Sequence, residues 1–593
     1  MKRVWVGLFV AAILWIAALT QWGLQLAVDE VEFFRATKWV GQGLRPFRDF
    51  WEHHLPLQWF VFGPIARLFA NGPGVESIVV MRWAQMAMWI AIFALLVRFM
   101  RRAGLDPWPS LVLLLVSASF VRKAIEYRVD VPGNLAYVAG VALIAFGAGT
   151  RRWLGFGALM SLAVLANMRL APLVIVTAAL ALFWRAEERR WRWNGRALWM
   201  LGGVVPVVAA FVGWLSYAGA WPKFIDGVFH YNATSARLLE VDTFFDALLM
   251  PLWTLDVAGV AFWIAGIAGA ALVLRNLREP GPLQFVALLF AASVGTIALM
   301  EVQYDYHFQN AYLLMLPLAA LAISRVRTVV PAIVAAGALG IALIQTVPSF
   351  GEAMEYQDAV MTSADRLTSP EEKVLDGGGF ALRRKPAYRY WFLTTGVRFM
   401  AAKGMIEPFK VTSWPPGAII YDYRLALYLR DFPDLARYAT KHYVPVYRNL
   451  WVPGMALIAR AALHPNPLPA PGERGQSAPR HIWVAPRAGT YDVWASEALL
   501  THPWLTKPLE YAAIEGPLAT RYVIPLAQLP PSPPEALQWR VDGVPQPRGT
   551  RSLKLRTGSR VELSSAFPRP TGVLLVPRGI GALCISTAEE KVF

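Results

Sequence analysis

Long apolar runs in roughly the first 350 residues constrain this chain more than any other feature. Each run is long enough to cross a hydrocarbon core of about 30 Å, and short charged loops separate the runs. Only 16% of all residues are charged and 56% are hydrophobic, as is typical of an integral membrane protein. The pattern predicts about eleven transmembrane helices, near residues 4–28, 79–97, 107–121, 132–150, 153–167, 170–184, 197–217, 250–274, 283–300, 308–323 and 329–348.

Basic residues mark alternate loops between these runs, and such loops usually face the cytoplasm. The N-terminus is therefore predicted to be cytoplasmic, and an odd number of spans places the C-terminus outside. On this topology, the loop that follows the first span faces outward. The basic residues are Lys2 and Arg3, Arg98 to Arg102, Arg151 and Arg152, Arg185 to Arg196, Arg275 and Arg278, and Arg325 and Arg327.

The net charge of +17 raises the question of nucleic-acid binding. In the first half of the chain, however, the basic residues alternate with the apolar runs and do not gather on one soluble face. Topology signals and attraction to anionic lipid head groups explain this excess of charge. We predict contacts with membrane lipids and no nucleic-acid partner.

The apolar runs stop near residue 348, which defines a membrane domain of residues 1–348. Residues 349–460 alternate short strand-like and helix-like stretches, which predicts a small extracytoplasmic α/β module. Residues 461–480 are rich in Pro and Gly and are expected to form a linker. Short strand-like segments separated by turns follow in residues 481–593, and they predict an extracytoplasmic β-sandwich-like module.

The polar loop after the first span is the strongest lead to chemistry. Asp29 and Glu30 lie at the predicted membrane boundary, where acidic groups are costly and are often functional. Aromatic, Pro and Gly residues and the pair His53 and His54 follow within about thirty residues. These features indicate a reaction at the outer membrane surface.

Four local motifs resemble the GT-C glycosyltransferases that use polyprenyl-phosphate sugars. The resemblance is greatest to the branch of protein O-mannosyltransferases, aminoarabinose transferases and rhizobial lipopolysaccharide-type transferases. It spreads over about 320 residues, and Leu55-Pro56 stands where the family often has two prolines. The motifs are Asp29-Glu30 with Phe33 or Phe34, the stretch from Gly43 to Trp59, Arg128-Val129-Asp130, and His307 to Pro317.

The resemblance implies an inverting glycosyltransferase that transfers a hexosyl or pentosyl group. A carboxylate near the acceptor would remove its proton, and Asp29, with Glu30, is the predicted catalytic group. Arginine forks suit the leaving lipid phosphate, and the predicted phosphate-binding residues are Arg169, Arg128 and Arg82. The predicted substrate-binding residues are Asp49, Asp130, His54, His307 and Gln309.

Each assignment has a purely structural alternative. Asp29 and Glu30 could end a helix at the water boundary, and Arg169 could reach the interface from a helix broken near Pro172. Asp49 and Asp130 could cap loops or pair with neighbouring arginines. No cofactor is certain, although Glu30 and His307 could ligate a divalent metal ion.

We therefore predict a glycosyltransferase of a bacterial cytoplasmic (inner) membrane. It would move a sugar from a polyprenyl-phosphate donor to a glycolipid, polysaccharide or protein acceptor on the outer face. The bacterial location is implied by the resemblance. The alternative is a secondary transporter or lipid flippase with a glycan-binding exported domain, but the two repeated halves common in transporters are not evident in this sequence.

Overall fold

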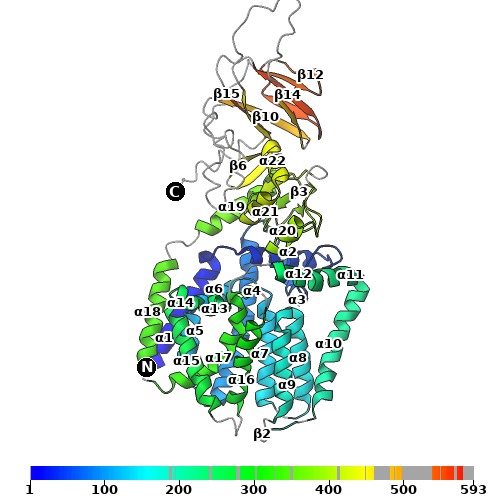
Figure 1. The fold of residues 1–593 in the computed structure, drawn as a ribbon. Helices are drawn as coiled ribbons and strands as arrows, with labels where there is room; N and C mark the ends of the chain where they lie inside the picture. The colour runs from blue at the N-terminus through cyan, green and yellow to red at the C-terminus, as the bar shows by residue number, and fades with distance from the viewer. Residues whose placement is uncertain are drawn as a thin grey trace, which may run out of the picture. The chain divides into compact units, whose positions relative to one another are not determined.

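The computed structural model divides the chain into two compact units, Met1–Gln357 and Asp358–Phe593, each considered by itself (Figure 1). The structure describes residues 2–147, 149–185, 190–193, 195–238, 244–275, 281–300, 303–326, 329–346, 352–410, 415–447, 449–459, 481–486, 488–496, 537–547, 549–565 and 571–578. The predicted linker at 461–480 lies outside these residues.

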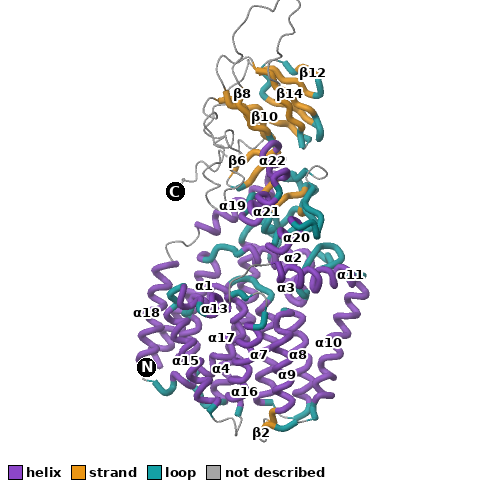
Figure 2. Tube along the Cα trace, in the orientation of Figure 1, coloured by secondary structure: helices purple, strands orange, loops and turns teal. Residues whose placement is uncertain are grey.

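The first unit is almost entirely helical (Figure 2). Among its described residues, five helices are long and apolar enough to cross a membrane, or six if one sharply bent pair counts as a span. The chain is thus a multi-pass membrane protein, as predicted. The five are Arg3–Gly23, which joins α1 (Lys2–Ala18) to the π-helix η1 (Leu19–Gly23), α4 (Glu76–Arg102), α10 (Ala197–Ala218), α15 (Val257–Leu274) and α18 (Val329–Thr346).

Shorter helices complete the unit, and one of them, α3 (Leu57–Phe69), was not predicted from the sequence. Gly63 and Pro64 interrupt the apolar pattern of this segment in the sequence. In the structure, Pro64 nevertheless lies inside the helix. The others are α2 (Val28–Gly41), α7 (Asp130–Phe146), α8 (Arg151–Ala166), η2 (Met168–Leu170), α9 (Ala171–Phe183), α11 (Trp221–Phe224), η3 (Ile225–Tyr231), α12 (Asn232–Leu238), α13 (Phe244–Leu248), α14 (Met250–Trp253), α16 (Pro282–Ala298), η4 (Asp305–Phe308) and α17 (Gln309–Ile323), with a short ribbon of β1 (Trp184–Arg185) and β2 (Arg190–Trp191).

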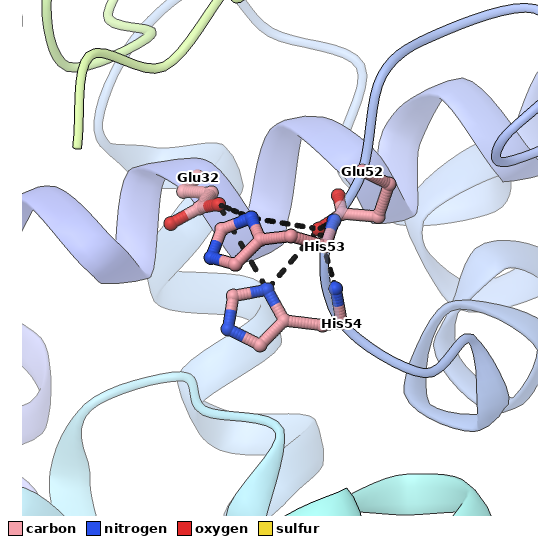
Figure 3. A group of neighbouring side chains, drawn as sticks. All are labelled: Glu32, Glu52, His53 and His54. Carbon is pink, nitrogen blue, oxygen red and sulfur yellow. Dashed lines mark hydrogen bonds and ion pairs between the residues drawn. The ribbon is translucent and has the colours of Figure 1, made fainter. Parts of the chain in front are cut away.

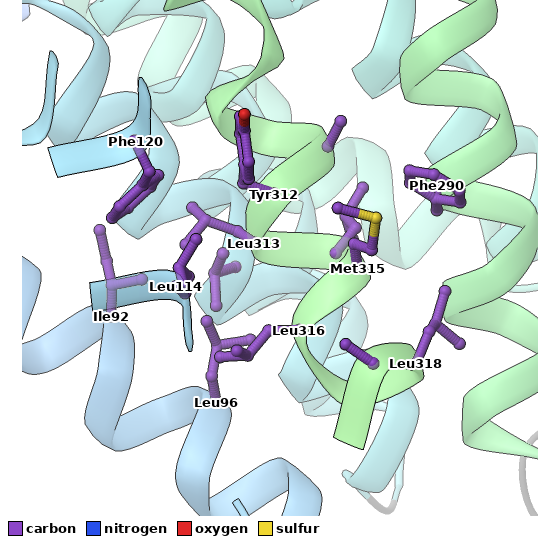
Figure 4. Close-up of a cluster of buried hydrophobic side chains, with 14 of the residues drawn as sticks. Ile92, Leu96, Leu114, Phe120, Phe290, Tyr312, Leu313, Met315, Leu316 and Leu318 are labelled. Atoms are coloured by element: carbon purple, nitrogen blue, oxygen red, sulfur yellow. The ribbon is translucent and has the colours of Figure 1, made fainter. Parts of the chain in front are cut away.

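The helix α17 lies within the core of this unit, and nearly all of its side chains are buried. Leu313, Leu316 and Leu318 pack among residues of neighbouring helices such as Leu96 of α4 and Phe290 of α16 (Figure 4). A helix that is apolar on every side is expected where other helices surround it. The first turn of α17 contains the polar residues Gln309 and Asn310. Both are buried, so the packing of the helix also fixes where they lie.

The predicted span at 107–121 is instead a broken pair, α5 (Trp108–Leu115) and α6 (Ala118–Ile125), bent by 71°. Asp256 stabilises the bend, because its Oδ2 accepts hydrogen bonds from Ser117 Oγ at 2.7 Å and from the Ser119 N–H at 2.9 Å. Its Oδ1 accepts the Gly259 N–H at 2.9 Å and thereby caps α15. One buried carboxylate thus fixes both α6 and the start of α15.

The second unit holds a mixed five-stranded sheet and two antiparallel four-stranded sheets. The mixed sheet has the order β4-β3-β5-β7-β6, with helices α20, α21 and α22 between its strands, and the others have the orders β13-β10-β15-β8 and β12-β11-β14-β9. Buried Trp483, Trp539 and Tyr491 belong to the core that the two antiparallel sheets share. These elements resemble the predicted α/β and sandwich-like modules. The strand β8 lies within the range predicted for the α/β module, but it pairs with β15 of the sandwich-like module.

The bounds of the second unit's elements are as follows: α19 (Glu352–Leu367, which begins in the first unit), β3 (Lys373–Asp376), β4 (Lys385–Pro386), α20 (Thr395–Ala402), β5 (Ala418–Ile420), α21 (Tyr423–Asp431), α22 (Pro433–His442), β6 (Tyr443–Tyr447), β7 (Leu450–Pro453), β8 (Met455–Ala459), β9 (His481–Val484), β10 (Gly489–Ser496), β11 (Leu537–Val541), β12 (Val544–Pro545), β13 (Ser552–Leu555), β14 (Arg560–Ser565) and β15 (Thr571–Pro577).

We expect Asp256→Ala to destabilise the first unit. The substitution removes the acceptor of three hydrogen bonds and leaves buried donors without a partner, a cost of about 1–3 kcal/mol for each buried group. Thermal unfolding of the protein in lipid nanodiscs should therefore show a lower midpoint than wild type. An unchanged midpoint would contradict the role given to Asp256 at the bend.

Candidate functional site

The first helix ends at Gly23, and Asp29 and Glu30 lie in the first turn of a separate helix, α2. The sequence pattern had extended the first span to residue 28, with a loop after it. Carboxylates in a first turn interact favourably with the exposed N–H groups and dipole of the helix, which explains why the helix starts here. Asp29 is partly exposed, with 34% of its side chain accessible, whereas Glu30 is completely buried.

Glu30 forms a buried two-point ion pair with Arg82 of α4. Its Oε1 and Oε2 accept hydrogen bonds from Arg82 Nε at 2.6 Å and Nη2 at 2.7 Å, and Oε1 also accepts the Tyr127 N–H at 2.9 Å. A third guanidinium nitrogen, Nη1, donates to the Leu24 carbonyl at 2.9 Å. Both side chains are fully buried, so neither is placed to meet a substrate directly. The predicted catalytic Glu30 and the predicted phosphate-binding Arg82 are thus paired with each other in the interior of the unit.

Arg128 lies at the centre of a group of carboxylates. Its Nε donates to Asp130 Oδ2 at 3.0 Å, its Nη1 donates to Glu126 Oε2 at 3.0 Å, and Nη1 lies 3.8 Å from Asp29 Oδ2. The other Asp130 oxygen accepts a hydrogen bond from Asn167 Nδ2 at 2.6 Å. Arg128 therefore links the predicted residues Asp29 and Asp130, but much of its charge is already balanced by carboxylates.

Arg169, by contrast, is exposed and has no carboxylate among its described partners. Its Nη1 contacts Tyr306 Oη at 3.1 Å and the Nε2 of His307. The ring of Tyr306 also lies 3.9 Å from the Arg128 guanidinium carbon and 5.7 Å from that of Arg169. Tyr306, which the sequence analysis did not single out, therefore joins the two arginines.

His307 and Arg169 are in direct contact through Nε2 and Nη1. Burial, Arg169 and Arg128 lower the pKa of His307 well below its usual range, so the ring is neutral. Nδ1 of the ring lies 3.2 Å from the Tyr304 N, and Nε2 is in direct contact with Arg169 Nη1. The Arg169 cation therefore lies against a neutral imidazole and not against a carboxylate.

Asp49 lies apart from this cluster, within the loop that follows α2. Its Oδ2 accepts the Arg45 N–H at 2.7 Å, and its Oδ1 lies 3.5 Å from Arg48 Nε. The structure thus gives Asp49 the loop-capping role that the sequence had left as an alternative. Gln309 lies in the first turn of α17, and its Oε1 accepts a hydrogen bond from Asn134 Nδ2 at 3.1 Å.

Glu32, Glu52, His53 and His54 converge at one place between α2 and the loop before α3 (Figure 3). One ligand atom from each lies within 4.8 Å of the others. His54 Nδ1 lies 3.1 Å from Glu52 Oε1, and His53 Nδ1 lies 3.5 Å from Glu32 Oε1. Burial raises the pKa of Glu52 to about 7 and lowers that of His54 to about 3.

The predicted metal pair Glu30 and His307 is engaged elsewhere, with Arg82 and Arg169 respectively. The described residues bring together the Glu32, Glu52, His53 and His54 group instead, and it includes the predicted substrate-binding His54. Two neutral imidazoles and carboxylate oxygens are ligands that Zn²⁺ accepts. Glu52 Oε2 and His53 Nδ1 are also buried with no hydrogen-bond partner, so the group fits a cation.

No protein-family model and no curated protein sequence matches this chain. Two solved structures are similar to it, both of ArnT from Cupriavidus metallidurans. The apo structure has a TM-score of 0.53 and 16% identity and covers 76% of this chain and 98% of its own. The structure bound to undecaprenyl phosphate has a TM-score of 0.50 and 14% identity, with coverages of 77% and 92%. The predicted GT-C-like fold is therefore confirmed.

The Glu30–Arg82 pair yields a prediction for stability. Removing one member of a buried ion pair strands the other charge and typically costs about 3–5 kcal/mol. We expect Arg82→Met alone to lower the free energy of unfolding by about this amount. Glu30→Leu combined with Arg82→Met should cost less than Arg82→Met alone, because no charge remains buried.

A double-mutant cycle of unfolding in mixed micelles measures this coupling. If the double variant were as unstable as the sum of the two single variants, the pair would not be coupled. The proposed role of Glu30 and Arg82 as a unit would then be wrong.

Proposed function

We propose that the protein is an inverting membrane glycosyltransferase that uses a polyprenyl-phosphate sugar donor. The observation that carries the proposal is the cluster of a partly exposed carboxylate, Asp29, with Arg128, Arg169 and His307 in a helical membrane unit. The ArnT-like fold supports it, since one of the similar structures holds undecaprenyl phosphate. The reaction would take place on the outer face of a bacterial cytoplasmic membrane, with a glycolipid, polysaccharide or protein as acceptor.

Asp29 is the general base in this proposal. It is the predicted catalytic carboxylate that remains accessible, and its Oδ2 lies 3.8 Å from Arg128 Nη1. The carboxylate would take the proton of the acceptor hydroxyl as the oxygen attacks the anomeric carbon. The C–O bond to the lipid phosphate breaks at the same carbon, and the polyprenyl phosphate leaves with the bonding electron pair.

Arg169 and His307 receive the phosphate. Arg169 is a cation that is exposed enough to reach a lipid head group, and the imidazole of His307 lies in contact with it. Arg128 has a different task, because Asp130 and Glu126 already occupy its donors. It holds Asp29 and Asp130 in place and, through Tyr306, sets the position of Arg169.

A divalent cation, with Zn²⁺ as the best match, belongs to the same proposal. Glu32, Glu52, His53 and His54 would hold it, and its positive charge would stabilise the buried carboxylate of Glu52. Bound there, it would fix the loop before α3 against α2, the helix that carries Asp29.

We expect purified protein to contain about one equivalent of zinc per chain by elemental analysis. His53→Ala combined with His54→Ala should remove most of it, because both imidazole ligands are lost. The control is His230→Ala, which changes an exposed histidine of η3. Equal zinc in the double variant and in the control would exclude this metal site.

We expect Asp29→Asn to slow sugar transfer by about 10²–10⁴-fold, the usual contribution of a positioned base. The measurement is label transfer from a panel of radiolabelled polyprenyl-phosphate sugars to membrane extract, with purified protein in bilayers. Binding of undecaprenyl phosphate should persist, because Arg169 and His307 are unchanged.

Asp106→Asn is the matched control, since Asp106 is an exposed carboxylate between α4 and α5 that caps Trp108. Asparagine also caps helices well, so this variant should transfer sugar at the wild-type rate. Undiminished transfer by Asp29→Asn would remove Asp29 from the mechanism. Absence of transfer from every donor, together with protein-dependent translocation of lipid or solute, would favour the transporter alternative.

A further inference from the structure

A polar pocket adjoins Arg169, Tyr306 and His307. It lies among α7, α16, α17 and the turn η2, and its lining includes Asn134, Ser293, Thr296, Gln309 and Asn310. Hydroxyl and carboxamide groups inside a membrane domain are expensive unless they are paired. The pocket therefore calls for a ligand that can pair them.

Three buried carboxamide atoms in this lining have no hydrogen-bond partner: Asn134 Oδ1, Gln309 Nε2 and Asn310 Oδ1. The three side chains are exposed by only 0%, 3% and 7%. Asn134 Nδ2 donates to Gln309 Oε1, which leaves this pair with one free acceptor and one free donor. If both amides were flipped, the free donor would lie on Asn134 and the free acceptor on Gln309. The pair would still have one free donor and one free acceptor.

A sugar hydroxyl both donates and accepts a hydrogen bond, so a ring with several hydroxyls matches a lining with free donors and acceptors. Ser293 and Thr296 add hydroxyl groups, and the Thr296 Oγ1 donates to the Ser293 carbonyl at 2.9 Å. Leaving a buried polar atom unpaired is costly, since the atom has lost its hydrogen bond to water. Pairing these atoms would therefore add substantially to the affinity for a sugar.

The charges in the lining favour a neutral sugar over a charged one. Asp130 is the carboxylate that lines this pocket among the described residues, and both of its oxygens are engaged, by Arg128 and Asn167. No free carboxylate is thus available to balance an ammonium group on the sugar. Arg169 is the cation of this lining, and in the proposed mechanism it binds the phosphate.

We infer that this pocket binds the sugar of the donor and selects a neutral, multiply hydroxylated pyranose over amino sugars and uronic acids. The inference rests on the proposed function, because a phosphate held by Arg169 and His307 would direct the attached sugar into this pocket. Asn134, Gln309 and Asn310 are then specificity-determining residues.

The test separates sugar binding from phosphate binding. Wild type and Asn134→Leu in nanodiscs are each titrated with bare undecaprenyl phosphate and with undecaprenyl phosphate carrying a neutral hexose. Asn134→Leu should bind the hexose-bearing lipid about 10-fold or more weakly, because one or more buried hydrogen bonds are lost. Its affinity for the bare lipid should remain that of wild type, which also shows that the variant is folded.

Gln309→Met is the second variant, and it should reproduce the selective loss. Asn71→Leu is the control, since Asn71 is an exposed amide outside the pocket. Unchanged affinity for the hexose-bearing lipid in both pocket variants would overturn the inference. So would an equal loss for both lipids in both variants, because the pocket would then not be specific to the sugar.

Transfer assays with a donor panel of neutral hexose, neutral pentose, amino-pentose and hexuronic acid complete the test. Preference of wild type for a neutral donor supports the inference. Transfer of only an amino sugar or a uronic acid would refute it and leave the glycosyltransferase function intact. Failure to bind or transfer any sugar-bearing lipid would instead refute the glycosyltransferase function itself.

Discussion

The candidate site depends on the buried ion pair between Glu30 and Arg82. Arg82 belongs to the long helix α4, and Glu30 belongs to α2, so the pair fixes the helix that carries Asp29 against the membrane bundle. Glu30 also accepts the Tyr127 N–H, while Gln85 of α4 accepts the Arg128 N–H at 2.8 Å. The backbone that presents Arg128 is thus held from two sides. The cost of burying Glu30 and Arg82 is offset by nearly complete hydrogen bonding.

The two arginines of the site, Arg128 and Arg169, have different surroundings. Arg128 is enclosed by carboxylates and organises them, whereas Arg169 is exposed and shares its surroundings with Tyr306 and His307. An anion placed near Arg169 would pair with a cation whose direct contacts among the described residues are Tyr306 and His307. The neighbouring amide pocket would then receive whatever group the anion carries. On this proposal, the lipid phosphate and the sugar would be bound by neighbouring residues of one pocket.

Much of this site was predictable from the sequence, because its residues are conspicuous in their surroundings. Asp29, Arg169 and His307 are polar groups beside long apolar runs, and charged residues at such places are costly unless they have a use. The buried role of Glu30 was not predictable, since its partner lies 52 positions away on another helix. The same holds for Glu52, whose grouping with Glu32 depends on how the loop folds back onto α2. Asn134 shows no signal in sequence, because a single amide in an apolar helix has many structural explanations.

The most direct test of the central claim is a cryo-electron microscopy structure of the protein in nanodiscs with undecaprenyl phosphate. The phosphate should lie within hydrogen-bond distance of Arg169 and His307, with the lipid chain entering from the membrane and Asp29 facing the same opening. A phosphate bound elsewhere, with Arg169 still in contact with His307, would contradict the proposed site.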